Sequence, residues 1–174
     1  TKYVASYQAK VLAKNPEGMP VSFLSNHDMD RSAGAFVTEN HTRMAANLYL
    51  LSPGSPVIYY GEEIGMKGAG KDENKRLPMY WSDDADDPDI CAGPPDKDEI
   101  PMKFPSAAEQ MKDDLSIWTW FREVIRVRNA FPAIARGLTE SVDSLSDSNV
   151  AAFIRRSRES GTANSASDGD LLIV

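Results

Sequence analysis

Helical and strand-like patterns alternate along most of the chain, and this alternation constrains its fold most strongly. Apolar residues recur at helical spacing over residues 3–14 and 38–52, and a third helix is expected over 106–130. Two short apolar runs, MPVSFLS (19–25) and SPVIYY (55–60), lie between these helices and are typical of buried strands. The order helix, strand, helix, strand, helix predicts parallel strands joined by crossover helices.

The spacing of apolar residues also predicts which helical faces are buried. The second helix is expected to bury Met44, Ala45, Leu48 and Leu51. Ser106 and Glu109 have the spacing of a capping box that would open the third helix. That helix is expected to bury Ile117, Phe121, Val124 and Ile125.

Two strands are too few for an independent fold. A parallel pair needs cover on both faces and both edges, so we expect this chain to be a fragment of a larger α/β unit. The apolar run LLIV (171–174) at the end of the chain supports the same expectation. In a barrel of parallel strands the site lies at the carboxyl ends of the strands. Asn26, His27 and Asp28 follow the first strand, and Glu62 and Glu63 follow the second.

The chain changes character after Gly137. The runs VAAFIRRS (150–157) and LLIV are typical of strands, and residues 159–170 between them are rich in Ser, Gly, Asp and Asn. This pattern predicts an antiparallel hairpin with a long connecting loop.

Composition excludes some classes of function. The net charge is −7 and the basic residues are dispersed, which argues against a nucleic-acid partner. No apolar run approaches the roughly 20 residues that cross a bilayer, so no membrane span is expected. The single Cys91 excludes an internal disulfide.

Three ordered motifs then carry a specific resemblance. FLSNHD (23–28), GSPVIYYGEEIG (54–65) and DENKRLPMYW (72–81) together resemble the α-amylase family, glycoside hydrolase family 13. The segment 113–137 resembles the last barrel helix of that family and its exit. The resemblance implies an α/β fold, in which residues 1–136 form the C-terminal portion of a (β/α)8 TIM barrel. Residues 137–174 would begin the antiparallel β-sandwich that follows.

The resemblance also implies a chemistry. The family performs retaining hydrolysis or transfer at α-glucosidic bonds with a nucleophile and a general acid, about 5–5.5 Å apart. Asp28 matches the third carboxylate, which stabilises the transition state without attacking, and Asn26 and His27 beside it are expected to bind the same sugar. No segment of this sequence matches the nucleophile or acid motifs, which would precede Thr1. The isolated chain is therefore expected to be inactive.

Asp72 and Arg76 match a family pair that contacts the neighbouring sugar. A surface ion pair is an equally good interpretation of these two residues, and the plain alternative for Asn26–Asp28 is a polar capping loop. For Glu62 and Glu63 we expect a structural role, with one of them in an ion pair. Asp30 and Arg31 are also interpreted as structural.

No cofactor or metal is expected in this chain. The acidic run SDDADDPD (82–89) lacks the ligand spacing of an EF-hand, so a solvated loop is the better interpretation. The resemblance allows structural calcium in the full-length protein, with ligands earlier in the barrel. Trp81 is either a sugar-stacking platform or a packing residue.

These observations favour a starch or malto-oligosaccharide hydrolase as the parent enzyme, with an α-glucan as its substrate. The alternatives are an α-glucosidase, a neopullulanase-like hydrolase or a glucanotransferase of the same family, or a non-catalytic relative. A secreted or cell-surface location is slightly favoured for the parent. The fragment itself is expected to expose apolar faces and to self-associate, or else to be an incomplete expression product.

Overall fold

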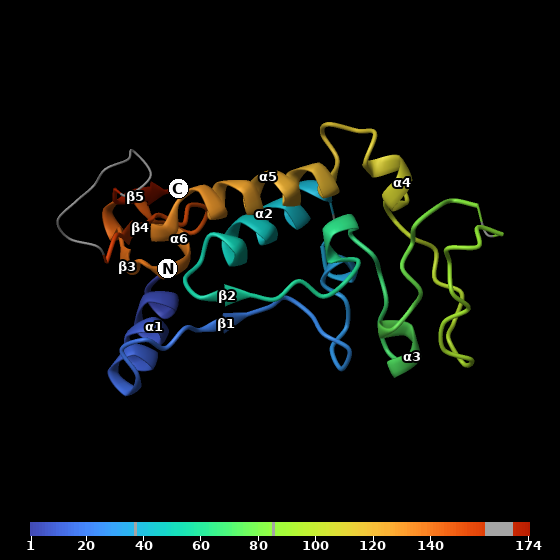
Figure 1. The fold of residues 1–174 in the computed structure, drawn as a ribbon, viewed down its shortest axis with the longest axis horizontal. Coiled ribbons are helices and arrows are strands. Elements are labelled where there is room, and N and C mark those ends of the chain that lie inside the picture. The colour runs from blue at the N-terminus through green and yellow to red at the C-terminus, as the bar shows by residue number, and fades with distance from the viewer. Residues whose placement is uncertain (37, 85, 159–168) are drawn as a thin grey trace. The chain divides into compact units, whose positions relative to one another are not determined.

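A computed structural model describes residues 1–36, 38–84, 86–158 and 169–174 (Figure 1). The chain divides into two compact units. The first unit comprises Thr1–Ser22, Leu48–Pro56 and Val124–Val174, and the second comprises Phe23–Asn47 and Val57–Glu123. The domain boundary expected at residue 137 stays a prediction. None of the described helices is long and apolar enough to cross a membrane.

The first unit contains the parallel strand pair that the helix–strand alternation predicts. Helix α1 spans Lys2–Lys14, and strands β1 (Val21–Ser22) and β2 (Ser55–Pro56) pair in parallel. The parallel direction is therefore confirmed, but both strands are shorter than the apolar runs that predict them. Pro56 contributes to this because proline has no N–H to donate to the ladder.

A close backbone approach joins the start of β2 to the residue before β1. Gly54 has a φ of +97°, and a Cβ at this position would lie 2.0 Å from the carbonyl oxygen of Pro20. The amide of Ser55 donates to that same oxygen at 2.8 Å. Glycine is required here both for the backbone angle and for the space.

The second sheet of this unit is antiparallel, with β3 (Leu138–Ser141), β4 (Phe153–Arg156) and β5 (Leu171–Ile173) in that order (Figure 1). The predicted pairing of β4 with β5 is confirmed. Most of the loop expected between them, residues 159–168, lies outside the described residues. Sequence reasoning missed β3 because LTES has a single large apolar residue, Leu138, which is exposed.

Two buried arginines tie carbonyl groups together in this unit. Arg155 is fully buried, and its NH2 group donates to the carbonyls of Ile134 at 2.9 Å and Gly137 at 2.7 Å. Burial lowers the pKa of Arg155 to about 10. Arg128 donates to the carbonyls of Leu50 at 2.5 Å and Ser52 at 2.9 Å. Ile134 belongs to α6 (Pro132–Arg136), and η3 spans Asp143–Leu145.

Helix α2 (Glu39–Leu50) is confirmed, but its predicted apolar face is wrong in part. Met44 is 56% exposed and Leu48 is 47% exposed. The buried residues are Thr42, Ala45, Ala46, Tyr49 and Leu50. Their spacing of three and four is equally helical, but the small residues among them carry less hydrophobic signal than Met and Leu.

The third predicted helix is interrupted. Ser106 precedes the one-turn helix α4 (Ala107–Gln110), but its hydroxyl donates to Asp83 at 3.1 Å instead of capping. Helix α5 begins only at Ile117 and ends at Ala130. Ser116 caps it, since the Ser116 hydroxyl accepts the amide of Thr119 at 3.1 Å. The predicted capping box is therefore wrong, whereas burial of Ile117, Phe121 and Val124 is confirmed.

The short elements of the second unit are η1 (Ser32–Gly34), η2 (Glu62–Ile64) and α3 (Asp72–Lys75). Ile64 belongs to a buried cluster with Met66, Leu77 and Ala107. Large apolar side chains remain exposed in both units, among them Tyr3 and Val21 in the first and Phe23 and Leu115 in the second. Self-association of the chain stays a prediction.

We expect Gly54→Ala to destabilise the protein much more than Gly70→Ala. Both glycines have positive φ, but a Cβ at Gly70 meets no atom within 4 Å. Gly70→Ala should cost about 1–2 kcal/mol for its backbone conformation alone, and Gly54→Ala should cost more than ~3 kcal/mol because a backbone atom must also move. Urea unfolding of the two variants measures the difference. Equal losses would contradict the close approach at Pro20.

Candidate active site

The turn that follows β1 in the chain presents the first three predicted site residues. The amide of Asp28 donates to the side-chain oxygen of Asn26 at 2.8 Å. This side chain-to-backbone bond closes a local turn that asparagine favours. Asn26 therefore shapes the turn, and His27 and Asp28 project from it, with side chains 62% and 68% exposed.

Each oxygen of the Asp28 carboxylate lies close to a nitrogen of a neighbouring side chain. His27 Nε2 lies 3.3 Å from one carboxylate oxygen, and a guanidinium nitrogen of Arg76 lies 3.3 Å from the other. An ionised carboxylate has roughly four acceptor positions, so two such neighbours leave it able to accept further donors. The exposed position makes those remaining lone pairs accessible to a ligand.

Helix α3 and the residue after it carry the second predicted pair. Arg76 lies 3.8 Å from the Asp72 carboxylate while also contacting Asp28. Lys75 donates from Nζ to Asp72 at 3.1 Å and to the main-chain oxygen of Asp28 at 3.1 Å. The hydrogen bond from Lys75, followed by the charges of Lys75 and Arg76, lowers the pKa of Asp72. The structure thus brings Asp72 and Arg76 together with Asp28, and their roles toward sugar stay predictions.

Lys75 is a site residue that sequence reasoning missed. It is only 9% exposed, although lysine is seldom buried without a partner. Its spacing of three from Asp72 on a helical turn was the one available signal. The contact with the Asp28 carbonyl joins segments 47 residues apart in the chain, which local spacing does not predict.

Arg31 is a buried residue that holds the backbone next to the candidate site. It is 2% exposed, and it donates to the carbonyls of Lys75 at 3.1 Å and Tyr60 at 2.5 Å. Its guanidinium carbon lies 4.6 and 4.5 Å from the ring centres of Tyr59 and Tyr60. Asp30 accepts the amide of Gly70 at 3.0 Å. The structural interpretation of Asp30 and Arg31 is confirmed.

One of Glu62 and Glu63 was expected to form an ion pair with a basic residue, but neither does so among the described residues. Glu62 is 3% exposed, and the hydroxyl of Ser25 donates to one of its oxygens. Burial raises the pKa of both carboxyls above the usual range. No donor among the described residues reaches the second oxygen of either side chain. Glu62 is therefore buried and hydrogen-bonded to Ser25, and it is not held by an ion pair.

The acidic run does not gather its carboxylates as a calcium site would. Asp84 and Asp87 each accept a backbone amide two residues later, at 3.0 and 2.9 Å. Asp83 instead accepts hydrogen bonds from Tyr80 and Ser106. In the part of the chain that the structure describes, no three His, Cys, Asp or Glu side chains are placed to hold a metal ion.

Comparison with known proteins decides the family. The family model of the alpha-amylase catalytic domain matches residues 2–137. This chain belongs to the alpha-amylase family. Relatives that resemble the chain include an alpha-amylase and a 4-alpha-glucanotransferase.

Individual members of the alpha-amylase family show how much of a whole enzyme this chain represents. The alpha-amylase SusG of Bacteroides thetaiotaomicron is 33% identical over 141 residues, which are 78% of this chain and 20% of that protein. A 4-alpha-glucanotransferase of Thermotoga neapolitana is 37% identical over 70 residues, 37% of this chain and 16% of that protein. The chain thus spans a fifth or less of these relatives.

A solved structure of the same family confirms the predicted fold class. Amy13B of Eubacterium rectale superposes with a TM-score of 0.85 and 38% identity, over 90% of this chain and 31% of that chain. The chain is a C-terminal portion of the alpha-amylase barrel with an antiparallel sheet after it.

We expect Glu62→Gln to flatten the dependence of stability on pH. A carboxyl whose folded pKa is raised stabilises the fold fully below its unfolded pKa, and that contribution is lost as pH rises through the folded pKa. The amide cannot ionise, so the stability of the variant relative to the unsubstituted chain should rise between pH 4.5 and pH 7. Urea unfolding over this range measures it. Glu17→Gln, at an exposed position, serves as the control. An identical pH slope in the parent and Glu62→Gln would refute the role of burial at Glu62.

Proposed function

We propose that this chain forms one wall of the active site in a retaining enzyme that hydrolyses α-1,4-glucosidic bonds of starch or malto-oligosaccharides. The observation that carries the proposal is the exposed Asp28 carboxylate, held between His27 and Arg76 at 3.3 Å on each side. The alpha-amylase name of the relative SusG supports the substrate class.

The proposed role of Asp28 is to hold sugar hydroxyls while positive charge develops on the ring. Hydrogen bonds from hydroxyl to carboxylate are charge-assisted, and they strengthen as the ring approaches an oxocarbenium-like transition state. His27 is placed to donate to a hydroxyl of the same sugar from its exposed ring. Asp28 neither attacks nor protonates the substrate in this scheme.

Arg76 is proposed to bind the neighbouring sugar. Its guanidinium offers a planar fork of donors, and only part of that fork is directed at Asp28 and Asp72. A ligand hydroxyl near Arg76 would therefore lie within reach of Asp72 as an acceptor as well. The alternative, a plain surface ion pair, predicts no change in substrate affinity when Arg76 is replaced.

Bond cleavage needs a nucleophile and a general acid, and no sequence motif of this chain supplies them. Retaining hydrolysis requires that pair about 5–5.5 Å apart across the scissile bond. We therefore propose that residues 1–174 alone have no hydrolytic activity and that the complementary carboxylates belong to a preceding barrel segment.

We expect Asp28→Asn in the full-length enzyme to lower kcat on a maltosyl substrate by on the order of 100- to 1000-fold. Stability should change by less than about 0.5 kcal/mol, because the side chain is exposed. Initial rates and thermal melting measure the two effects. Asp86→Asn, in the exposed acidic loop, is the matched control and should keep parental activity. Full activity of Asp28→Asn would remove Asp28 from the mechanism.

A glucanotransferase is the second candidate, and the Thermotoga relative is the observation that favours it. Hydrolase and transferase share the same Asp28 chemistry and differ in the acceptor, which is water in one case and a sugar in the other. Products longer than the starting malto-oligosaccharide would identify a transferase. A mixture of shorter products alone supports the hydrolase. Absence of any turnover would favour a non-catalytic relative.

A further inference from the structure

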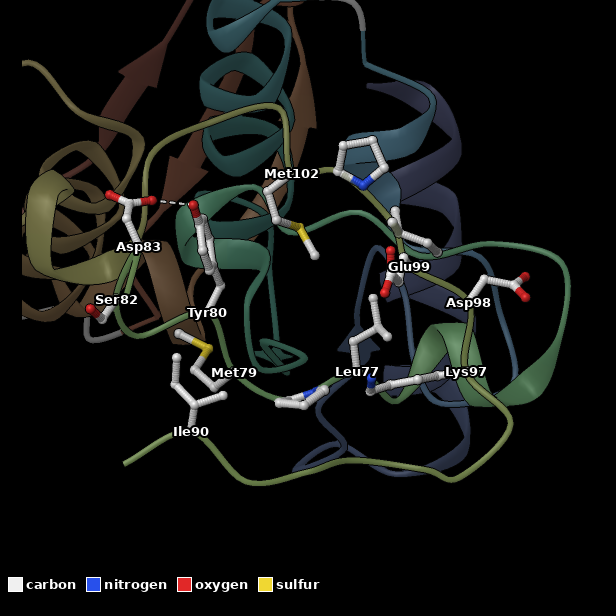
Figure 2. Close-up of a pocket in the computed structure, with 13 residues that line it drawn as sticks. Leu77, Met79, Tyr80, Ser82, Asp83, Ile90, Lys97, Asp98, Glu99 and Met102 are labelled. Atoms are coloured by element: carbon white, nitrogen blue, oxygen red, sulfur yellow. Dashed lines mark hydrogen bonds between the residues drawn. The ribbon is translucent and has the colours of Figure 1, made fainter. Parts of the chain in front are cut away.

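The stretch 97–102 passes beside helix α3, the helix that begins at Asp72 (Figure 2). It forms part of the wall of a cavity of about 600 Å³, whose lining also includes Leu77, Met79 and Tyr80. Asp98 and Lys97 are on the side of this cavity that lies next to α3 in Figure 2. The cavity itself is largely apolar, and the side chains with specific polar partners are at its edge.

Asp98 makes a two-sided contact with α3. One oxygen of its carboxylate accepts Asn74 Nδ2 at 2.9 Å, and the other accepts Lys71 Nζ at 2.5 Å. The main-chain amide of Asp98 in turn donates to Asn74 Oδ1 at 2.8 Å. We call Lys71, Asn74 and Asp98 the clasp. Hydrogen bonds from Asn74 and Lys71 lower the pKa of Asp98, so the clasp keeps its charge at neutral pH.

The clasp differs from an ordinary surface ion pair because one of its members, Asn74, is buried. Asn74 is 4% exposed, and its Nδ2 also donates to the carbonyl of Ala69 at 3.0 Å. A Cβ at Gly68 would lie 2.1 Å from the carbonyl oxygen of Asn74, so the backbone of α3 is packed tightly on this side. Loss of a partner for a buried amide is more costly than loss of an exposed pair.

Residues next to Asn74 contact the proposed substrate-binding groups. Lys75 donates to Asp28 and Asp72, and Arg76 contacts the same two carboxylates. The clasp residue Asn74 directly precedes Lys75 and Arg76 in the chain. A shift of Asn74 would therefore move Arg76 relative to Asp28.

We propose that Asp98 is a positioning residue, which holds α3 through Asn74 so that Asp72 and Arg76 are set for the neighbouring sugar. The proposal rests on the function proposed above, and Asp98 itself touches no substrate in it. The proposal gives residues 97–102 a role in substrate affinity, although they are far from Asp28 in the sequence.

The test compares Asp98→Ala, Asp98→Asn and the matched control Asp96→Asn. Asp96 is exposed and lies two residues before Asp98, and its hydrogen bond from Lys71 goes to the main-chain oxygen, which the substitution leaves in place. Hydrogen exchange of amides 71–77 is measured in residues 1–174 and in the full-length enzyme. We expect exchange to rise about fivefold in Asp98→Ala, by less in Asp98→Asn, and not in Asp96→Asn.

Kinetics of the full-length enzyme provide the second readout. We expect Asp98→Ala to raise KM for malto-oligosaccharides about fivefold and to change kcat by less than about twofold, because the Asp28 turn has its own support from Asn26. Asp98→Asn and Asn74→Ala should be non-additive when combined, since they break one shared contact.

The outcomes separate the two proposals. Unchanged exchange at 71–77 in Asp98→Ala, or an equal KM change in Asp96→Asn, would overturn the positioning role. Faster exchange without any glucan turnover in the parent enzyme would retain the clasp and reject the proposed function. If Asp98→Ala does not fold, the exchange and KM of Asp98→Asn decide in its place.

Discussion

The buried guanidinium of Arg31 is the interaction on which the site depends. A buried charge is costly unless its donors are satisfied, and Arg31 directs two of its nitrogens at the carbonyls of Lys75 and Tyr60. Its third nitrogen, Nη2, has no hydrogen-bond partner among the described residues. Those carbonyls belong to the segment after β2 and to α3, whereas Arg31 itself lies three residues after Asp28. One side chain therefore links the three segments that carry the candidate site. The rings of Tyr59 and Tyr60 pack against the guanidinium and exclude water from these hydrogen bonds.

The site separates groups that position from groups that bind. Arg31, Asn74 and Lys75 are 2%, 4% and 9% exposed, and their contacts run mainly to backbone atoms and to one another's segments. His27 and Asp28, whose side chains are exposed, and the partly exposed Arg76 rest on this support. Binding groups on loops need such a rigid base, because a displacement of about 1 Å can cost much of the activity. The clasp extends the same base to a part of the chain beyond the motifs.

Sequence alone could predict the order of elements and the convergence of strand ends, because both follow from hydrophobic periodicity and from the geometry of parallel sheets. It placed Asn26, His27 and Asp28 at a strand end for that reason, whereas Arg76 was assigned to the site through the resemblance to the family. It could not predict the break between α4 and α5, where Gln110 uses its side chain to bond the carbonyls of Ile64 and Pro105. Nor could it find Lys75 or Asp98, since their partners are distant in sequence and their residue types are usually solvated.

The exposure of Asp28 has a consequence for how it would act. Two unit charges 4 Å apart interact by about 1 kcal/mol in water and about 4 kcal/mol at an effective dielectric of 20. With Asp28 68% exposed and held by one wall, its attraction for a developing positive charge is weak until a bound sugar displaces the surrounding water. The buried groups beneath cannot supply that exclusion, because they support the carboxylate from its own side. In the proposed mechanism, the low dielectric therefore comes from the bound sugar and from the barrel segment that is proposed to carry the two reacting carboxylates.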